Sequence, residues 1–286
     1  MIDAIAYEPE RAYDVRVYDV TYREDGDGRW LARIYRPEGA GPFPALLDVH
    51  GGAWNRGSYT SNESIDRALA ATGIVVAASA LRRAPKYPYP SQVADVNYGA
   101  RWLKARAQDF NADGRRLGGL GSSSGGHTIM LSAMRPRDAR YSALPLAGGE
   151  SLDATFAYIV AAWPVLDCYA RYLYAKETGR AQLVESTEAY FGNEEAMKEG
   201  NPQLILERGE PVELPPVLIL QGTNDDNVPL SIPHRFAESY RAAGGSVQLE
   251  LFPGMPHGFA RDPGPETERA LALTKAFIAR QLGGKR

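Results

Sequence analysis

Cysteine is almost absent from this 286-residue chain, since Cys168 is the only one. A lone cysteine excludes an internal disulfide and a cysteine-based metal cluster, and we expect Cys168 to be a small buried apolar residue. Charge of one sign is also scarce, because the formal net charge is only -3. The chain therefore offers no basic surface of the kind that nucleic acid requires.

Long apolar runs are missing as well. No stretch approaches the roughly 20 residues of a membrane-spanning helix. The first 17 residues, MIDAIAYEPERAYDVRV, lack the cationic start and apolar core of a signal peptide. These absences predict a soluble, cytoplasmic protein that binds neither nucleic acid nor membrane. They leave open whether it forms a homo-oligomer.

What is present is an alternation of apolar strands and helical segments. Residues 13–25 and 29–39 read as two strands joined by a DGDG turn. Further strands are expected at 43–52, 73–81, 116–121, 156–167, 215–222 and 247–254, and helices at 61–72, 91–108, 125–134 and 268–282. This order predicts a single α/β domain over 1–286, with a mostly parallel sheet covered by helices on both faces. The segment at about 168–214 is too long for a simple connection and predicts a helical cap insertion.

The stretch GSSSGG, residues 121–126, falls between a predicted buried strand and a predicted helix. In the pattern G-x-S-x-G, the serine stands on a tight strand-to-helix turn whose flanking positions come too close together to carry side chains. Only Ser123 has glycine at both positions, Gly121 and Gly125. Ser123 is therefore the candidate nucleophile, and the alternative is a serine that merely caps a helix.

A serine nucleophile needs a base, and the base needs an acid that orients it. His257 lies in the loop PGMPHGF after a late strand, from which it can reach the turn, whereas His127 in the helix that leaves the turn is the second candidate. Asp225 in GTNDDNVP follows another buried strand, and its rival is Asp167 at the end of AAWPVLD. The order Ser123, Asp225, His257 is the order found in α/β-hydrolases.

Acyl transfer also requires hydrogen-bond donors for the developing oxyanion. The loop HGGAW, residues 50–54, follows a buried strand and contains two glycines that let the backbone turn its N–H groups inward. The N–H groups of Gly52, Ala53 and Ser124 are the predicted donors.

Together these motifs resemble the hormone-sensitive-lipase-like esterases of the α/β-hydrolase fold, and the resemblance extends from about residue 15 to residue 282. The HGGAW loop is also similar to that of arylformamidases. The chain departs from the lipase-like group in having Ala53 where a third glycine is usual. It also has ALRRAP at residues 80–85 where that group has Asp-Tyr-Arg before Ala-Pro.

The resemblance implies a serine carboxylesterase that hydrolyses small to medium, including aromatic, esters with water and needs no metal or cofactor. An arylformamidase or another amide hydrolase with the same triad is the first alternative. A non-enzymatic small-ligand receptor on this fold is the second, and the complete triad disfavours it. Aromatic residues in and around the cap predict an apolar substrate pocket. The residues expected to line it are Trp54, Trp163, Tyr169, Tyr190 and Met255.

Overall fold

The computed structural model describes residues 7–26, 28–149 and 151–283, whose strands form one eight-stranded sheet of order β1-β2-β4-β3-β5-β6-β7-β8. β2 pairs antiparallel with β1 and β4, and the pairs from β4 to β8 are all parallel. The predicted hairpin therefore forms one edge of a mostly parallel sheet. The strands are β1 (Val15–Asp25), β2 (Gly28–Pro37), β3 (Phe43–Val49), β4 (Val75–Ser79), β5 (Ala112–Ser122), β6 (Tyr158–Ala162), β7 (Val217–Gly222) and β8 (Val247–Phe252).

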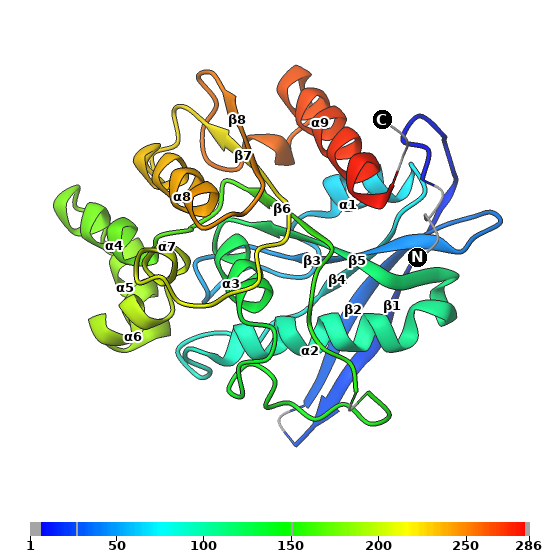
Figure 1. The fold of residues 1–286 in the computed structure, drawn as a ribbon, viewed down its shortest axis with the longest axis horizontal. Helices are drawn as coiled ribbons and strands as arrows, with labels where there is room; N and C mark the ends of the chain where they lie inside the picture. The colour runs from blue at the N-terminus through cyan, green and yellow to red at the C-terminus, as the bar shows by residue number, and fades with distance from the viewer. Residues whose placement is uncertain (1–6, 27, 150, 284–286) are drawn as a thin grey trace.

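From β3 onward helices alternate with the strands, and they cover the sheet on both sides (Figure 1). They are α1 (Glu63–Ala70), α2 (Ser91–Arg106), α3 (Ser124–Met134), α4 (Cys168–Glu177), α5 (Ala181–Phe191), α6 (Glu194–Glu199), α7 (Pro202–Glu207), α8 (Ser231–Ala242) and α9 (Pro265–Leu282), with short 3₁₀ helices η1 (Ala107–Phe110) and η2 (Phe259–Arg261).

The central strand β3 shows how the sheet organises the core. All of its residues are buried, as expected for a parallel strand covered on both faces. Successive side chains of a strand point to opposite faces. Ala45 and Leu47 accordingly join the apolar cluster beneath α2, α3 and α8, whereas Leu46 joins the cluster beneath α1 and α9. This three-layer packing brings the carboxyl ends of β3, β5, β7 and β8 to one edge of the sheet.

The segment between β6 and β7 is helical and holds α4 to α7, which gather beside α3 and α8 (Figure 1). Three of these helices begin at a side chain that accepts a hydrogen bond from the first turn, the usual function of an N-cap residue. Asp167 accepts from the Ala170 N–H, and Asn193 accepts from the Ala196 N–H. Asn201 starts α7 in the same way.

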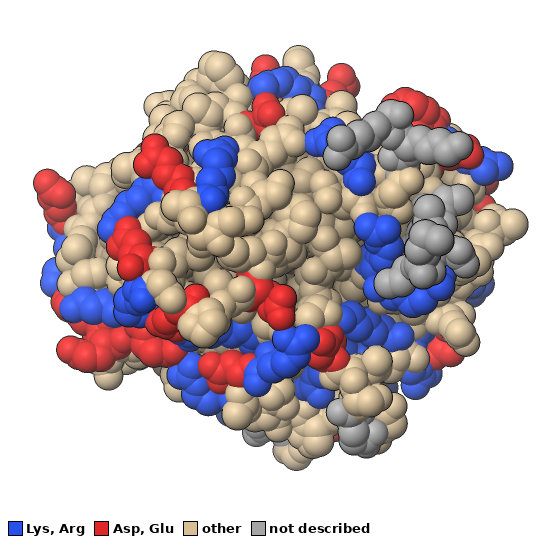
Figure 2. All heavy atoms as spheres, viewed as in Figure 1, with Lys and Arg blue, Asp and Glu red and all other residues tan. Residues whose placement is uncertain are grey.

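Figure 2 shows the surface of the molecule from the same side as Figure 1. On this face Lys and Arg are intermingled with Asp and Glu, and neither sign of charge forms a large area. Within the described ranges, none of the helices combines the length and the apolar character needed to cross a bilayer.

Candidate active site

Ser123 occupies the turn between β5 and α3 with a φ of 53°, in the left-handed region that few non-glycine residues adopt. Its flanking glycines are sterically required. A Cβ on Gly121 would lie 2.6 Å from Cγ2 of Ile129, and a Cβ on Gly125 would lie 2.1 Å from the carbonyl oxygen of Val49. The strained turn lifts the Ser123 hydroxyl above the sheet edge, where it lines a cavity.

A chain of two hydrogen bonds connects Ser123, His257 and Asp225. The Ser123 Oγ lies 2.9 Å from Nε2 of His257, and Nδ1 of His257 lies 2.8 Å from Oδ2 of Asp225. An ionised carboxylate can only accept, so Nδ1 carries the proton and the Nε2 lone pair faces the serine hydroxyl. The loops after β7 and β8 thus bring the predicted acid and base to the predicted nucleophile.

Asp225 is held by several further donors. Its Oδ2 accepts from Nε2 of Gln221, and its Oδ1 accepts from the N–H groups of Asn227 and Val228, each at 2.8 Å. Burial by itself would raise the pKa of Asp225, but the hydrogen bond and charge interaction with His257 and the backbone N–H groups outweigh it and lower that pKa. Asp225 is therefore ionised at neutral pH and fixed in orientation.

The rival acid, Asp167, has a different environment. Its Oδ1 accepts from the Ala170 N–H at 2.9 Å and from Nδ2 of Asn201 at 2.7 Å, and its Oδ2 lies 3.4 Å from Nη1 of Arg235. These contacts join the beginnings of α4 and α7 and include no histidine. Asp167 is the N-cap residue of α4.

The rival base, His127, is fully buried in α3. Its Nδ1 accepts from the indole N–H of Trp54 at 3.2 Å, and its Nε2 donates to the carbonyl oxygen of Gly200 at 2.7 Å. Burial lowers its pKa to about 4, and burial likewise lowers the pKa of His50 to about 4. His127 is a neutral packing residue that connects α3 to the turn between α6 and α7.

The two serines beside Ser123 hold the HGGAW loop. Ser122 Oγ accepts from the Gly51 N–H at 3.1 Å, and Ser124 Oγ accepts from the Trp54 N–H at 3.3 Å. This function of Ser122 and Ser124 was not predicted from the sequence. The signal was the run of hydroxyls at a buried turn, because buried polar groups must find partners.

Gly52 and Ala53 line the cavity beside Ser123, with positive φ values of 125° and 50°. Their backbone N–H groups donate no hydrogen bond to any of the described residues. Ser124 is the first residue of α3, and the first N–H groups of a helix have no partner within it. The three predicted oxyanion donors thus lie in two neighbouring segments, the HGGAW loop and the turn that carries Ser123.

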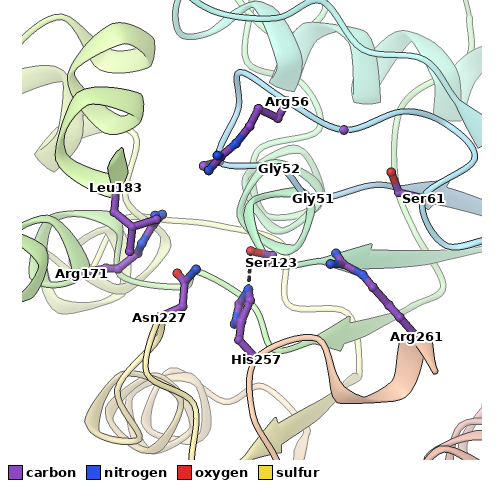
Figure 3. Close-up of a pocket in the computed structure, with 12 residues that line it drawn as sticks. Gly51, Gly52, Arg56, Ser61, Ser123, Arg171, Leu183, Asn227, His257 and Arg261 are labelled. Atoms are coloured by element: carbon purple, nitrogen blue, oxygen red, sulfur yellow. Dashed lines mark hydrogen bonds between the residues drawn. The ribbon is translucent and has the colours of Figure 1, made fainter. Parts of the chain in front are cut away.

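The cavity has a volume of about 390 Å³ and is bordered by Ser123, His257 and residues of the HGGAW loop (Figure 3). The prediction of an aromatic lining is corrected here. None of the five residues predicted to line the pocket borders this cavity, namely Trp54, Trp163, Tyr169, Tyr190 and Met255.

Aromatic packing explains the difference. The rings of Trp54 and Tyr190 stack in parallel with centroids 5.3 Å apart, and both residues are buried. Trp163 is also fully buried, packed edge-on against His257 and Phe259. Of the remaining two, Tyr169 donates its hydroxyl hydrogen to Glu194 at 2.8 Å, and Met255 packs against the core cluster beneath α1 and α9.

Charged residues take the place of the aromatics in the cavity wall, which includes Arg56, Arg171 and Arg261. The sequence did contain a signal for Arg171. In α4 the buried positions are Cys168, Arg171, Tyr172 and Ala175, so an arginine stands on the apolar face of the helix. An arginine on such a face indicates either a buried partner or a function.

The fold and the hydrogen-bonded triad define an α/β-hydrolase. Residues 33–240 match the family BD-FAE, and because this match covers more than half of the chain, the chain belongs to that family.

Among curated relatives, the esterase LipC of Mycobacterium tuberculosis is 30% identical over 76% of this chain and 53% of its own length. The ethyl acetate hydrolase of Pseudomonas putida is 29% identical over 82% of this chain and 73% of its own. The chain spans about half the length of the first curated relatives it matches.

Among solved structures, esterase 2 of Thermogutta terrifontis phosphoramylated by tabun superposes with a TM-score of 0.74 at 22% identity, covering 94% of this chain and 95% of that one. These matches confirm the fold and the resemblance to α/β-hydrolase esterases predicted from the sequence.

Proposed function

We propose that this chain is a serine carboxylesterase that hydrolyses small to medium esters through an acyl-enzyme. The observation that carries the proposal is the hydrogen-bonded series Ser123–His257–Asp225 beside a cavity bordered by Gly52 and Ala53. The names of the relatives, an esterase and an ethyl acetate hydrolase, support it.

In the acylation step, Oγ of Ser123 attacks the ester carbonyl carbon while Nε2 of His257 takes the hydroxyl proton. Asp225 holds the imidazole in the tautomer that can accept this proton, and stabilises the imidazolium that results. The carbonyl oxygen becomes negative and accepts hydrogen bonds from the free N–H groups of the HGGAW loop and of Ser124. The proton on His257 then passes to the leaving alkoxide, and the alcohol departs.

Deacylation repeats this chemistry with water. His257 takes a proton from a water molecule that attacks the acyl carbon, the same donors stabilise the second oxyanion, and Ser123 leaves with the proton. We also propose that α4 to α7 act as a cap over the cavity, since Arg171 of α4 and Leu183 of α5 border it (Figure 3). A cavity of about 390 Å³ lies near the lower end of the usual range for small-molecule sites, which favours small substrates.

The test uses the three neighbouring serines as matched variants. Ser123→Ala should reduce kcat on p-nitrophenyl acetate by about 10⁴-fold or more. Ser122→Ala and Ser124→Ala should keep labelling by a fluorophosphonate probe at Ser123, with smaller losses of rate from a loosened loop. Labelling at Ser122 or Ser124 in the intact protein would show that Ser123 is not the nucleophile. A higher kcat/KM on N-formylkynurenine than on the ester would indicate a formamidase instead.

A further inference from the structure

The charged residues that border the cavity beside Ser123 are all of one sign. Its wall contains the guanidinium groups of Arg56, Arg171 and Arg261, and none of the described residues that border it is an aspartate or glutamate. Figure 3 shows Arg56 and Arg171 on one side of Ser123 and Arg261 on the other. A cleft lined by charge of one sign concentrates ligands of the opposite sign.

Arg171 has the most demanding environment of the three. Its residue is 1% exposed, and its guanidinium carbon lies 5.4 Å from the ring centroid of Trp54. The Nε atom is buried without a hydrogen-bond partner, and the side chain forms no ion pair with any of the described residues. Burial lowers its pKa to about 10, so the group is still a cation at neutral pH.

Asp225, whose negative charge acts on Arg171, is not free to be its hydrogen-bonded partner. Asp225 already accepts hydrogen bonds from His257, Gln221, Asn227 and Val228. A buried cation without a counter-ion is strongly unfavourable. A ligand that brings its own anion into the cavity would remove that penalty.

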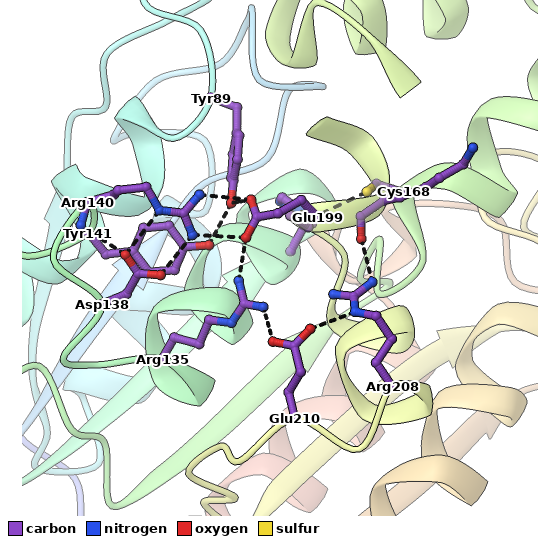
Figure 4. Close-up of polar contacts among 12 residues, drawn as sticks. Tyr89, Arg135, Asp138, Arg140, Tyr141, Cys168, Glu199, Arg208 and Glu210 are labelled. Atoms are coloured by element: carbon purple, nitrogen blue, oxygen red, sulfur yellow. Dashed lines mark hydrogen bonds and ion pairs between the residues drawn. The ribbon is translucent and has the colours of Figure 1, made fainter. Parts of the chain in front are cut away.

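Arginines that stabilise the fold of this protein look different. In the network of Figure 4, Arg135 pairs with Glu199 at 2.7 Å and also with Glu210, and Arg140 pairs with Glu199 at 2.9 Å. Arg208 completes the network by pairing with Glu210 at 2.6 Å. The guanidinium groups of this network have carboxylate partners. The guanidinium group of Arg171 has none among the described residues, and Arg171 borders the cavity instead.

We propose that the substrate is an ester that carries a carboxylate in its acyl or its alcohol part, and that Arg171 binds this carboxylate with the help of Arg56 or Arg261. The planar guanidinium group matches a carboxylate through two parallel hydrogen bonds. The proposal rests on the esterase function proposed above and specifies its substrate class. Arg171 on one side and Arg261 on the other allow the anion to lie in either part of the ester.

The first experiment needs only the parent protein. Hydrolysis of monomethyl glutarate is compared with that of dimethyl glutarate, and hydrolysis of acetoxyacetate with that of ethyl acetate, by titrating the released acid. The anionic ester of at least one pair should have the larger kcat/KM by about 10- to 100-fold, the value of a charge-assisted hydrogen bond. The pair that shows the preference tells whether the acyl or the alcohol part bears the anion.

The second experiment tests the assignment to Arg171. Arg171→Met removes the charge but keeps an unbranched side chain against Trp54, and it should lower the ratio of anionic to neutral kcat/KM by about 10-fold or more. Lys176→Met makes the same change of charge on an exposed position of α4 that does not border the cavity, so it should keep the parental ratio. If Arg171→Met does not fold, competitive inhibition of the parent by glutarate but not by glutaramide still supports a substrate that bears a carboxylate.

Two results would overturn the proposal in distinguishable ways. If the parent enzyme hydrolyses the neutral ester of both pairs as fast as the anionic one, or faster, it is still an esterase, but the proposal of a carboxylate-bearing substrate is wrong. If the parent enzyme hydrolyses none of the four esters and is not labelled at Ser123, the proposed esterase function is wrong as well.

Discussion

Two histidines lie close to the Ser123 turn, and their surroundings differ in almost every respect. His257 is partly exposed at the cavity, faces a hydroxyl with Nε2 and donates from Nδ1 to a carboxylate. His127 is sealed in the core, and its two neighbours are an indole N–H and a backbone carbonyl. One imidazole has a place for a transferred proton and an acid that stabilises the resulting charge. The other has neither.

A histidine that is close in sequence to the proposed nucleophile is therefore not necessarily the one that can act as its base. His127 is four residues from Ser123, and His257 is 134 residues away. The helix that begins at the turn carries His127 under the sheet edge, whereas the loop after β8 returns His257 above it. Burial keeps the His127 ring neutral, whereas His257 lies where its two ring nitrogens meet Ser123 and Asp225.

The largest effect should come from His257→Ala. Without a base, the serine hydroxyl is a weak nucleophile, and kcat should fall by about 10⁵- to 10⁶-fold. The measurement is steady-state hydrolysis of p-nitrophenyl acetate beside His127→Ala, which should retain most of the turnover at a temperature well below its melting point. A His127→Ala protein that folds and is the inactive one of the two would reverse the assignment.

The second largest effect should come from Asp225, the carboxylate that distinguishes His257 from His127. Asp225→Asn leaves a hydrogen-bonding group of the same shape but misorients the imidazole, and kcat should fall by about 10⁴-fold with little change in stability. Asp226→Asn is the matched control, because its exposed carboxylate pairs only with Arg180 at 3.1 Å among the described residues, and it should remain within a few-fold of the parent. If Asp167→Asn is crippling and Asp225→Asn is mild, the acid belongs to the loop after β6.

The smallest effect concerns stability. His127→Leu leaves the indole N–H of Trp54 and the carbonyl oxygen of Gly200 without partners, which should lower the free energy of unfolding by about 1–3 kcal/mol at pH 7. Urea denaturation at pH 7 measures this, with His127→Gln as the variant that can still make one or both hydrogen bonds.

The same variant has a defined pH dependence. The pKa of His127 is about 4 in the folded protein and about 6.5 in an unfolded chain, so below pH 6.5 the unfolded state binds the extra proton. The stability that His127 contributes is therefore complete above pH 6.5 and is lost as pH falls toward 4. The deficit of His127→Leu should shrink by about 1.4 kcal/mol for each pH unit below 6.5. A deficit that grows as pH falls would contradict the buried, neutral state of this ring.

Much of the fold and the triad could be predicted because the signals are local. The apolar runs fix the strands, and the requirement for glycine at 121 and 125 follows from the turn itself. Asp225 and His257 stand directly after buried strands, where the parallel topology brings the ends together. The location of such residues can be predicted without knowing how the side chains pack.

The wall of the cavity could not be predicted in this way. Trp54 and Tyr190 stack although 136 residues separate them, and that contact exists only once the segment of α4 to α7 has docked on α3. The same docking decides which face of α4 turns inward and so places Arg171 at the cavity. Composition suggested an aromatic pocket because it counts residues near the site without knowing which of them pack against one another.

The bonds from Ser122 and Ser124 to the HGGAW loop have a consequence for engineering this chain. The Gly51 and Trp54 N–H groups bind the loop of the proposed oxyanion donors to the turn of the proposed nucleophile, and both lie at the edge of the sheet. Arg171 and Leu183 of the cavity wall come instead from α4 and α5. Helices α4 to α7 could therefore be exchanged for those of another family member to change which ester is accepted. Such a graft would have to retain the ring of Tyr190, because it stacks on Trp54 and so touches the loop that holds the donors.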